Sequence, residues 1–363
     1  MRRLTALLTA GMLLCCTGCQ MQDARADERI QIVATVFPQY DFARAIAGEY
    51  ADVTLLLAAG QEKHNYEPTP MDVAEISRCD MFLRIGGESE VWTTTLLDAL
   101  DTSEMQVVTL MEHIEAPLVE EHHHHHGEHA NEAHEEHAEE EEHAEEEHEE
   151  HAEEEHEEHA EEGHEEHAEE GHEEHAEEDP HGEESHEGHF DEHIWNSPVN
   201  AIAMVQAVCD ALCTEDPAHA AVFRERADAY IAELSALDAD YRELAESCED
   251  PVLMIGDKFP FRYLAAEYGF HYAAAFTGCS SETEPTIGAL AELFEEAEHH
   301  GLDTVFYLEF SSRKIADRIC AVTGARAEML HPCHNVSQEN LENGTTLLDM
   351  MRENYEVIKE ALT

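Results

Sequence analysis

The sequence predicts an α/β protein of two lobes, each with a mainly parallel sheet flanked by helices, joined by one long backbone helix. Three observations support this prediction. Short apolar strands alternate with helical segments in residues 30–115 and again in residues 251–362. Strands that are apolar throughout and separated by helices are typical of parallel sheets covered on both faces. Between these regions, an apolar stripe at spacings of three and four predicts a helix over residues 218–248.

The first lobe is expected to cover residues 30–217. Its helix at 69–79 has the clearest start, with Thr69 as N-cap, Pro70 at the first helical position and Asp72 in the first turn. In chain order the expected elements are strand IQIVATV, helix PQYDFARAIAG, strand ADVTLLLAAG, helix TPMDVAEISRC, and strands MFLRIGG and MQVVTL.

The linking helix is expected to begin near Asp216 and Pro217. Roughly 30 residues at about 1.5 Å each span about 45 Å, enough to cross from one lobe to the other. The second lobe, residues 249–363, repeats the alternation. Its expected strands are VLMIG, FHYAAAF, DTVFYLE and RAEML, and its expected helices lie near 261–268, 286–301, 313–324 and 341–362.

A low-complexity insert interrupts the first lobe at residues 120–190. From Glu120 to Glu192 the chain has 36 acidic residues and no Lys or Arg, and it contains four tandem octads of the type HEEHAEEG. Such a charge density without an apolar face predicts disorder in the absence of a ligand. The histidines expected to form an auxiliary metal-binding loop are His122, His123, His124, His125, His126, His148, His151, His156, His159, His164, His167, His172 and His175.

The net charge of −65 excludes some partners. Outside residues 120–192, 48 acidic residues still face 19 basic ones. Such a surface repels nucleic acid and attracts cations. We therefore expect no nucleic-acid partner.

The N-terminus resembles a bacterial lipoprotein signal. Arg2 and Arg3 precede a short apolar run, and Cys16-Thr17-Gly18-Cys19 resembles a lipobox. Residues 1–19 would be the signal peptide, Cys19 the lipidated residue and residues 20–29 a tether. The alternative is ordinary cleavage and secretion. Lipidation would hold the protein on the outer face of the cytoplasmic membrane.

Seven cysteines follow Cys19, in a compartment that permits disulfides. Cys209 and Cys213 share a helical face, as core residues or a nearby pair. Cys279 and Cys333 could form a disulfide between two loops of the second lobe.

Imidazoles and carboxylates follow several predicted strands. In open α/β sheets, ligands bind beyond the carboxyl ends of the strands. His and carboxylate side chains gathered there suit zinc and related divalent metals. The residues concerned are His64, His193, Asp257, Glu309, His331 and His334. Their joint placement in both lobes predicts one metal site in the cleft between them.

Four motifs together carry a family resemblance: GQEKHNYEPTPMD, GGESEVW, DEHIWNSPVNA after the insert, and YLEFSSRKIADRI. From about Ile30 to Leu362 the chain resembles the zinc- and manganese-binding lipoproteins of bacterial ABC importers, and its insert is similar to that of the zinc-specific branch. The resemblance implies a rigid pair of lobes with the metal between them, passed to a membrane permease subunit.

The resemblance also implies a ligand set. His64 matches the first ligand, His193 the second and His331 the fourth. At the third position the chain has Lys258, which cannot ligate while protonated, so Asp257 is the better candidate. Water, Glu309 or His334 could also complete the sphere. Three imidazoles and one oxygen favour Zn²⁺ over Mn²⁺, which prefers more carboxylates.

The leading hypothesis is a monomeric zinc-import binding protein whose insert captures metal near the cleft. In one alternative the insert is a sensor that limits uptake, and in another it is an expendable tract. A secreted zinc hydrolase is disfavoured because the sequence contains neither H-E-x-x-H nor G-x-S-x-G. A manganese importer component, or a surface metal buffer or adhesin acting through the repeat, remains as an alternative.

Overall fold

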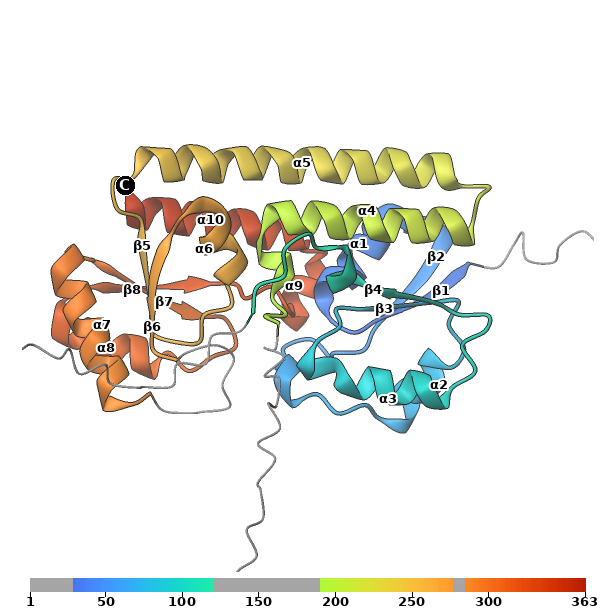
Figure 1. Cartoon of the computed structure of the whole chain (residues 1–363), viewed down its shortest axis with the longest axis horizontal. Coiled ribbons are helices and arrows are strands. Elements are labelled where there is room, and N and C mark those ends of the chain that lie inside the picture. The colour runs from blue at the N-terminus through green and yellow to red at the C-terminus, as the bar shows by residue number, and fades with distance from the viewer. Residues whose placement is uncertain (1–28, 120–189, 277–284) are drawn as a thin grey trace, which may run out of the picture. The chain divides into compact units, whose positions relative to one another are not determined.

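Two parallel four-stranded sheets organise the chain, one in each lobe (Figure 1). The computed structural model describes residues 29–119, 190–276 and 285–363. The strand order is β2-β1-β3-β4 in the first sheet and β6-β5-β7-β8 in the second. Within each sheet every neighbouring pair of strands is parallel. The predicted fold class is therefore confirmed.

The first lobe follows the predicted alternation and adds two helices, α3 and α4, to the elements expected in chain order. The start of α2 is as expected, since the Thr69 hydroxyl accepts a hydrogen bond from the Asp72 backbone and Pro70 is the first helical residue. The elements are β1 Ile30–Ala34, α1 Phe37–Ala47, β2 Ala51–Leu55, α2 Pro70–Ile76, β3 Met81–Arg84, α3 Val91–Ala99, β4 Gln106–Thr109 and α4 Pro198–Glu215.

The second lobe ends differently from the prediction of one final helix at 341–362. Gly344 adopts a left-handed conformation with φ of 76°, which ends α9, and Thr346 then caps α10 by accepting from the Asp349 backbone. The elements are β5 Val252–Ile255, α6 Arg262–Tyr268, β6 His271–Ala274, α7 Ile287–His300, β7 Thr304–Leu308, α8 Lys314–Thr323, β8 Arg326–Leu330, α9 Gln338–Asn343 and α10 Leu347–Leu362.

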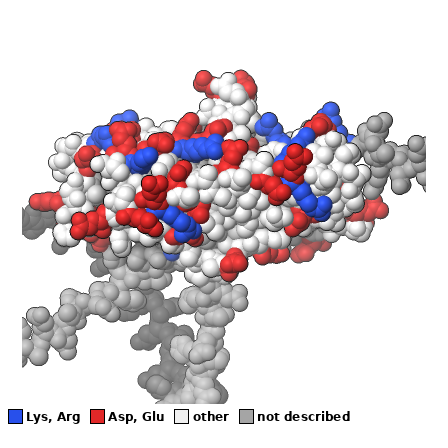
Figure 2. Space-filling model, turned by 90° about the horizontal axis from the view of Figure 1, so that it is seen from above, with Lys and Arg blue, Asp and Glu red and all other residues white. Residues whose placement is uncertain are grey.

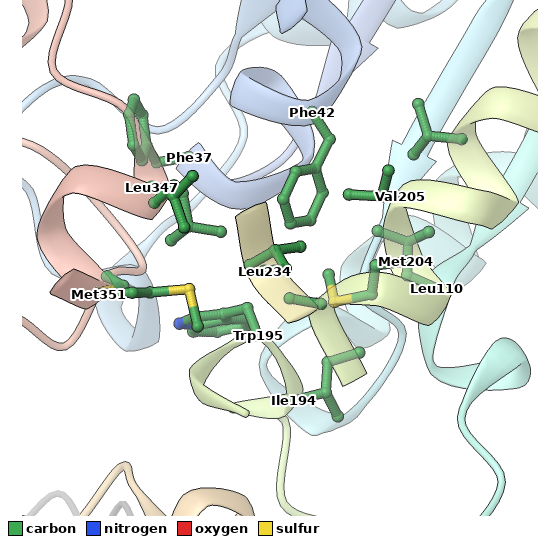
Figure 3. Packing of buried hydrophobic residues seen from close by; sticks show 14 of the residues in the cluster. Phe37, Phe42, Leu110, Ile194, Trp195, Met204, Val205, Leu234, Leu347 and Met351 are labelled. Carbon is green, nitrogen blue, oxygen red and sulfur yellow. The ribbon is translucent and has the colours of Figure 1, made fainter. Parts of the chain in front are cut away.

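The long helix α5, Ala220–Ser247, runs along both lobes and packs against elements of each (Figure 1). Its partners are α1 and α4 of the first lobe and α6 and α10 of the second. The predicted apolar stripe is buried at Phe223, Leu234 and Tyr241. One cluster of buried apolar side chains includes residues of both sheets, and Figure 3 shows its part around Leu234, Phe42, Trp195 and Met351.

Charged side chains of both signs alternate on the face that carries α5 (Figure 2). Arg242 pairs with Asp238 and Glu267, and Arg352 pairs with Glu233. The described part of this face has no continuous basic stripe of the kind that binds phosphate backbones.

The two ends of the insert meet. Val119 and Phe190 form an isolated antiparallel bridge, and the Asp191 backbone donates to the Leu118 carbonyl at 2.8 Å. The insert therefore leaves and re-enters the first lobe at neighbouring points. Its octads and the predicted loop histidines lie outside the described residues, as does Cys19.

Candidate metal centre

Three imidazoles predicted from sequence lie in loops of the two lobes. His64 lies in the 3-10 turn Lys63–Asn65 after β2, His193 directly precedes the turn Ile194–Asn196, and His334 follows β8. His64 and His193 are close, with 5.8 Å between their ring centroids.

Hydrogen bonds between the lobes fix these loops against one another. The Phe37 backbone donates to the His334 carbonyl at 3.0 Å, and the Asn335 amide donates to the carbonyls of Ala58 and Gln61, both at 2.8 Å. The Trp195 indole, two residues after His193, donates to the Pro332 carbonyl at 3.0 Å. Because these bonds cross between lobes, the loops are held in one arrangement.

His193 is oriented by a buried carboxylate. Its Nδ1 lies 2.9 Å from Oδ1 of Asp191, which is only 2% exposed and also accepts from the His193 backbone at 2.8 Å. We assign the ring proton to Nδ1 from this contact, which leaves a lone pair on Nε2. Metal-binding histidines commonly donate their other ring N–H to a carboxylate in this way.

His334 contains an unpartnered buried atom. The residue is 4% exposed, and its Nε2 is buried with no hydrogen-bond partner among the described residues. Burial lowers the pKa of His334 to about 4, because desolvation outweighs the nearby Glu62 carboxylate. The ring is therefore neutral at physiological pH, and a buried nitrogen of this kind needs a partner.

The pKa of His64 is also lowered. Desolvation is the main cause, followed by the positive charge of Lys63 and by His193. The pKa shifts of His64 and His334 both favour the neutral imidazole, the form that binds a metal.

His331 and Glu309 belong to a different group of hydrogen bonds. His331 Nδ1 lies 2.6 Å from Glu309, and its Nε2 lies 2.9 Å from Glu353. Burial alone would lower the pKa of His331, but the two carboxylates outweigh it and raise the pKa. Both ring nitrogens face carboxylates, so His331 could bind a metal only if one of these bonds broke.

Asp257 is also engaged elsewhere. Its carboxylate accepts from the Ser311 hydroxyl and, at 2.8 Å, from the Lys258 backbone. Burial raises the pKa of Asp257. Thus the structure brings His64, His193 and His334 together and places His331, Glu309 and Asp257 in other contacts.

A buried ion pair that was not predicted from the sequence lies next to two of the imidazoles. Lys63 Nζ lies 2.8 Å from Glu192, and the two side chains are 5% and 8% exposed. Ser89 donates to Glu192 from its backbone and hydroxyl. Lys63 directly precedes His64, and Glu192 directly precedes His193. These opposite charges beside the two histidines are the sequence pattern from which the ion pair could have been predicted.

The imidazole side chains are near one another, but they do not yet surround one point at which a metal could bind. Among the residues that the structure describes, no three His, Cys, Asp or Glu side chains converge closely enough to hold a metal as they stand. Binding therefore requires side-chain movements.

Two further predictions concern cysteine residues. Cys333 is buried, and its thiol donates to the His331 carbonyl, whereas Cys279 lies outside the described residues. The predicted disulfide therefore stays a prediction. Cys209 and Cys213 share the buried side of α4 with 4.0 Å between sulfurs.

No described helix is long and apolar enough to span a membrane.

The chain has two α/β lobes joined by a long helix, and imidazoles from loops of both lobes lie near one another. This combination defines a two-lobed metal-binding protein. A family model described as zinc-uptake complex component A, periplasmic, matches residues 32–361, and the chain belongs to this family.

Relatives within the family are moderately similar. The zinc-binding lipoprotein AdcA of Streptococcus pneumoniae strain TIGR4 is 28% identical over 361 residues, which are 99% of this chain and 61% of that protein. The high-affinity zinc uptake system protein ZnuA of Bacillus subtilis is 27% identical over 340 residues, covering 94% and 89% of the two chains. This chain thus spans about three fifths of the length of AdcA.

Among solved structures, the Zn(II)-bound ZnuA-like domain of S. pneumoniae AdcA matches with a TM-score of 0.64 and 25% identity. The match covers 92% of this chain and 99% of that domain.

Proposed function

We propose that this chain is the extracytoplasmic binding component of a zinc importer, and that it binds one Zn²⁺ through His64, His193 and His334. The observation that carries the proposal is the buried, unpartnered Nε2 of His334 beside two other imidazoles. Membership of the zinc-uptake family and the Zn(II)-bound AdcA domain support it. The protein acts as a carrier, not an enzyme.

The donor chemistry favours zinc over manganese. Neutral imidazoles are good zinc ligands at about 2.0–2.1 Å, whereas Mn²⁺ is better served by carboxylates and higher coordination. The ligand set proposed here replaces His331 by His334, because both nitrogens of His331 already face carboxylates. His331 and Asp257 remain testable as ligands.

We also propose that the protein delivers the zinc to an ABC permease subunit and that the chain is anchored to the membrane through Cys19. The His/Glu insert serves as an auxiliary that captures metal near the site. A metal buffer or adhesin acting through the insert is the second candidate, supported by the number of histidines in the repeat.

Deleting residues 121–189 separates these functions, because the bridge between Val119 and Phe190 allows a short connection. The shortened protein should bind one zinc tightly in competition with a chelator of known affinity, and manganese more weakly. His64→Ala should abolish tight binding, whereas the exposed His113→Ala is the matched control. Loss of all tight binding with the insert would reject the cleft site and make the repeat the functional element.

A further inference from the structure

The position of Asp191 decides where the free ring nitrogen of His193 points, because the Asp191 carboxylate holds the other nitrogen. Asp191 is held in turn through its own backbone. Its N–H donates to the Leu118 carbonyl at 2.8 Å, and its carbonyl accepts from the Tyr263 hydroxyl at 2.8 Å. The first bond lies within the first lobe, whereas the second comes from α6 of the second lobe.

The Tyr263 hydroxyl bonds to both ends of the insert. Besides donating to the Asp191 carbonyl, it accepts from the Leu118 backbone N–H at 3.0 Å. Tyr263 is 5% exposed, and burial raises the pKa of its phenol to about 12, so the hydroxyl keeps its proton at physiological pH. The hydroxyl is therefore donor and acceptor at once, and a phenylalanine ring could replace neither bond.

Neighbours of this tyrosine in the sequence hold the same segment of the first lobe. The Pro260 carbonyl accepts from the side-chain amide of Asn196 at 2.8 Å. The Arg262 guanidinium donates to the Val119 carbonyl at 2.7 Å. The segment that carries His193 is thus held by the start of α6 and by the loop before it, both of the second lobe.

The Tyr263 bond differs from these neighbouring bonds because it is made to the backbone of Asp191 itself. A shift of that backbone moves the carboxylate away from Nδ1 of His193, and the imidazole then loses its fixed direction. Outer-shell partners of metal-binding histidines contribute about 10–100-fold to metal affinity. A group that holds such a partner in place should contribute at the lower end of that range.

We infer that Tyr263 is a positioning residue of the zinc site, because it holds from the second lobe the carboxylate that orients His193. This inference rests on the proposed function. The direction of a zinc ligand in the first lobe depends, through this hydroxyl, on a helix of the second lobe.

The test compares Tyr263→Phe with Tyr268→Phe in the full-length chain. Tyr268 lies on the same helix, is 7% exposed and donates to Asp238 of α5 at 2.9 Å. Its substitution also removes a buried hydroxyl with its hydrogen bond, but it leaves Asp191 untouched.

Both variants are given less than one equivalent of Zn²⁺ or Co²⁺ in competition with a chelator. Tyr263→Phe should weaken zinc binding by about 10-fold and alter the visible absorption of the Co²⁺ complex. Tyr268→Phe should change neither, although both variants should lower the thermal stability of the metal-free protein.

A double variant shows whether Tyr263 acts through Asp191. Asp191→Ala keeps the backbone carbonyl to which Tyr263 donates, but it lacks the carboxylate. Adding Tyr263→Phe to Asp191→Ala should therefore cause no further loss of zinc affinity. The comparison of the two tyrosine variants decides the inference by itself if Asp191→Ala does not fold.

Other outcomes would overturn the inference. Equal losses of zinc affinity in the two tyrosine variants would show general destabilisation. An undiminished effect of Tyr263→Phe in the Asp191→Ala background would show that Tyr263 does not act through Asp191. Unchanged affinity in Tyr263→Phe, with binding abolished by His193→Ala, would exclude Tyr263 but keep the zinc site. Unchanged affinity in His193→Ala would instead reject the proposed function itself.

Discussion

His334 marks the candidate site most clearly at the scale of single residues. Its buried Nε2 has no protein partner among the described residues, a costly state for a polar atom unless a ligand satisfies it. By contrast, both nitrogens of His331 are satisfied within the fold.

His334→Ala is therefore expected to weaken zinc binding by at least about 100-fold, because it removes a direct ligand. In the absence of metal, His334→Ala should lower the thermal stability only by the amount that the lost side-chain packing contributes. His331→Ala is the matched comparison, measured by chelator competition. A larger loss of affinity in His331→Ala than in His334→Ala would restore the ligand set predicted from sequence.

A second single-residue prediction concerns Asp41, which is 3% exposed. Desolvation raises the pKa of its carboxyl from 3.8 to about 6, although the Leu347 backbone and the Tyr230 hydroxyl donate to it. The folded state thus holds this proton more tightly than the unfolded chain. The Asp41 contribution to stability grows as pH falls through 6 and is lost as pH rises above 6.

Asp41→Asn should remove this dependence. The unfolding free energy of the wild type minus that of the variant is expected to increase by about 2 kcal/mol between pH 7.5 and 4.5. Denaturant titrations at both pH values measure it. A constant difference would show that Asp41 does not titrate in this range.

At the scale of elements, the buried Lys63–Glu192 pair joins the loop after β2 to the segment that enters the turn Ile194–Asn196. The Lys63 ammonium also lies 5.1 Å from the centre of the Trp195 ring. Because each partner is adjacent to a proposed zinc ligand, the pair holds the backbones of His64 and His193 at a fixed separation.

Lys63→Met should destabilise the fold by about 3–5 kcal/mol, since it leaves the Glu192 carboxylate buried without a counter-charge. Lys63→Met combined with Glu192→Leu should be less destabilising than Lys63→Met. The exposed Arg352–Glu233 pair is the control, and Arg352→Met should cost less than about 1 kcal/mol. Equal losses in Lys63→Met and Arg352→Met would exclude an energetic role for the buried pair.

At the scale of the whole molecule, the lobes share one apolar core through α5 and α10. Each lobe also has a smaller apolar cluster of its own. Because the largest cluster includes residues of both lobes, neither lobe should unfold alone. Calorimetry of the metal-free protein lacking residues 121–189 is expected to show a single transition, with equal calorimetric and van't Hoff enthalpies. Two resolved transitions would contradict this reading.

Much of the fold could be predicted because it is determined locally. Apolar strands, the Thr69 cap and the stripe of α5 depend on neighbours in sequence, and each of these predictions is confirmed. The break at Gly344 and the helix α3 were missed, because a short polar segment or a short helix has a weak periodic signal.

The sequence by itself determined the fold class, the family motifs and the residue types gathered at the strand ends. Tertiary structure alone decided which of those side chains meet. His331 and His334 are three residues apart, yet one faces Glu309 and Glu353 while the other faces Glu62 and the other imidazoles. Strand order and loop-to-loop hydrogen bonds set these directions, and such long-range contacts leave no periodic trace in the sequence.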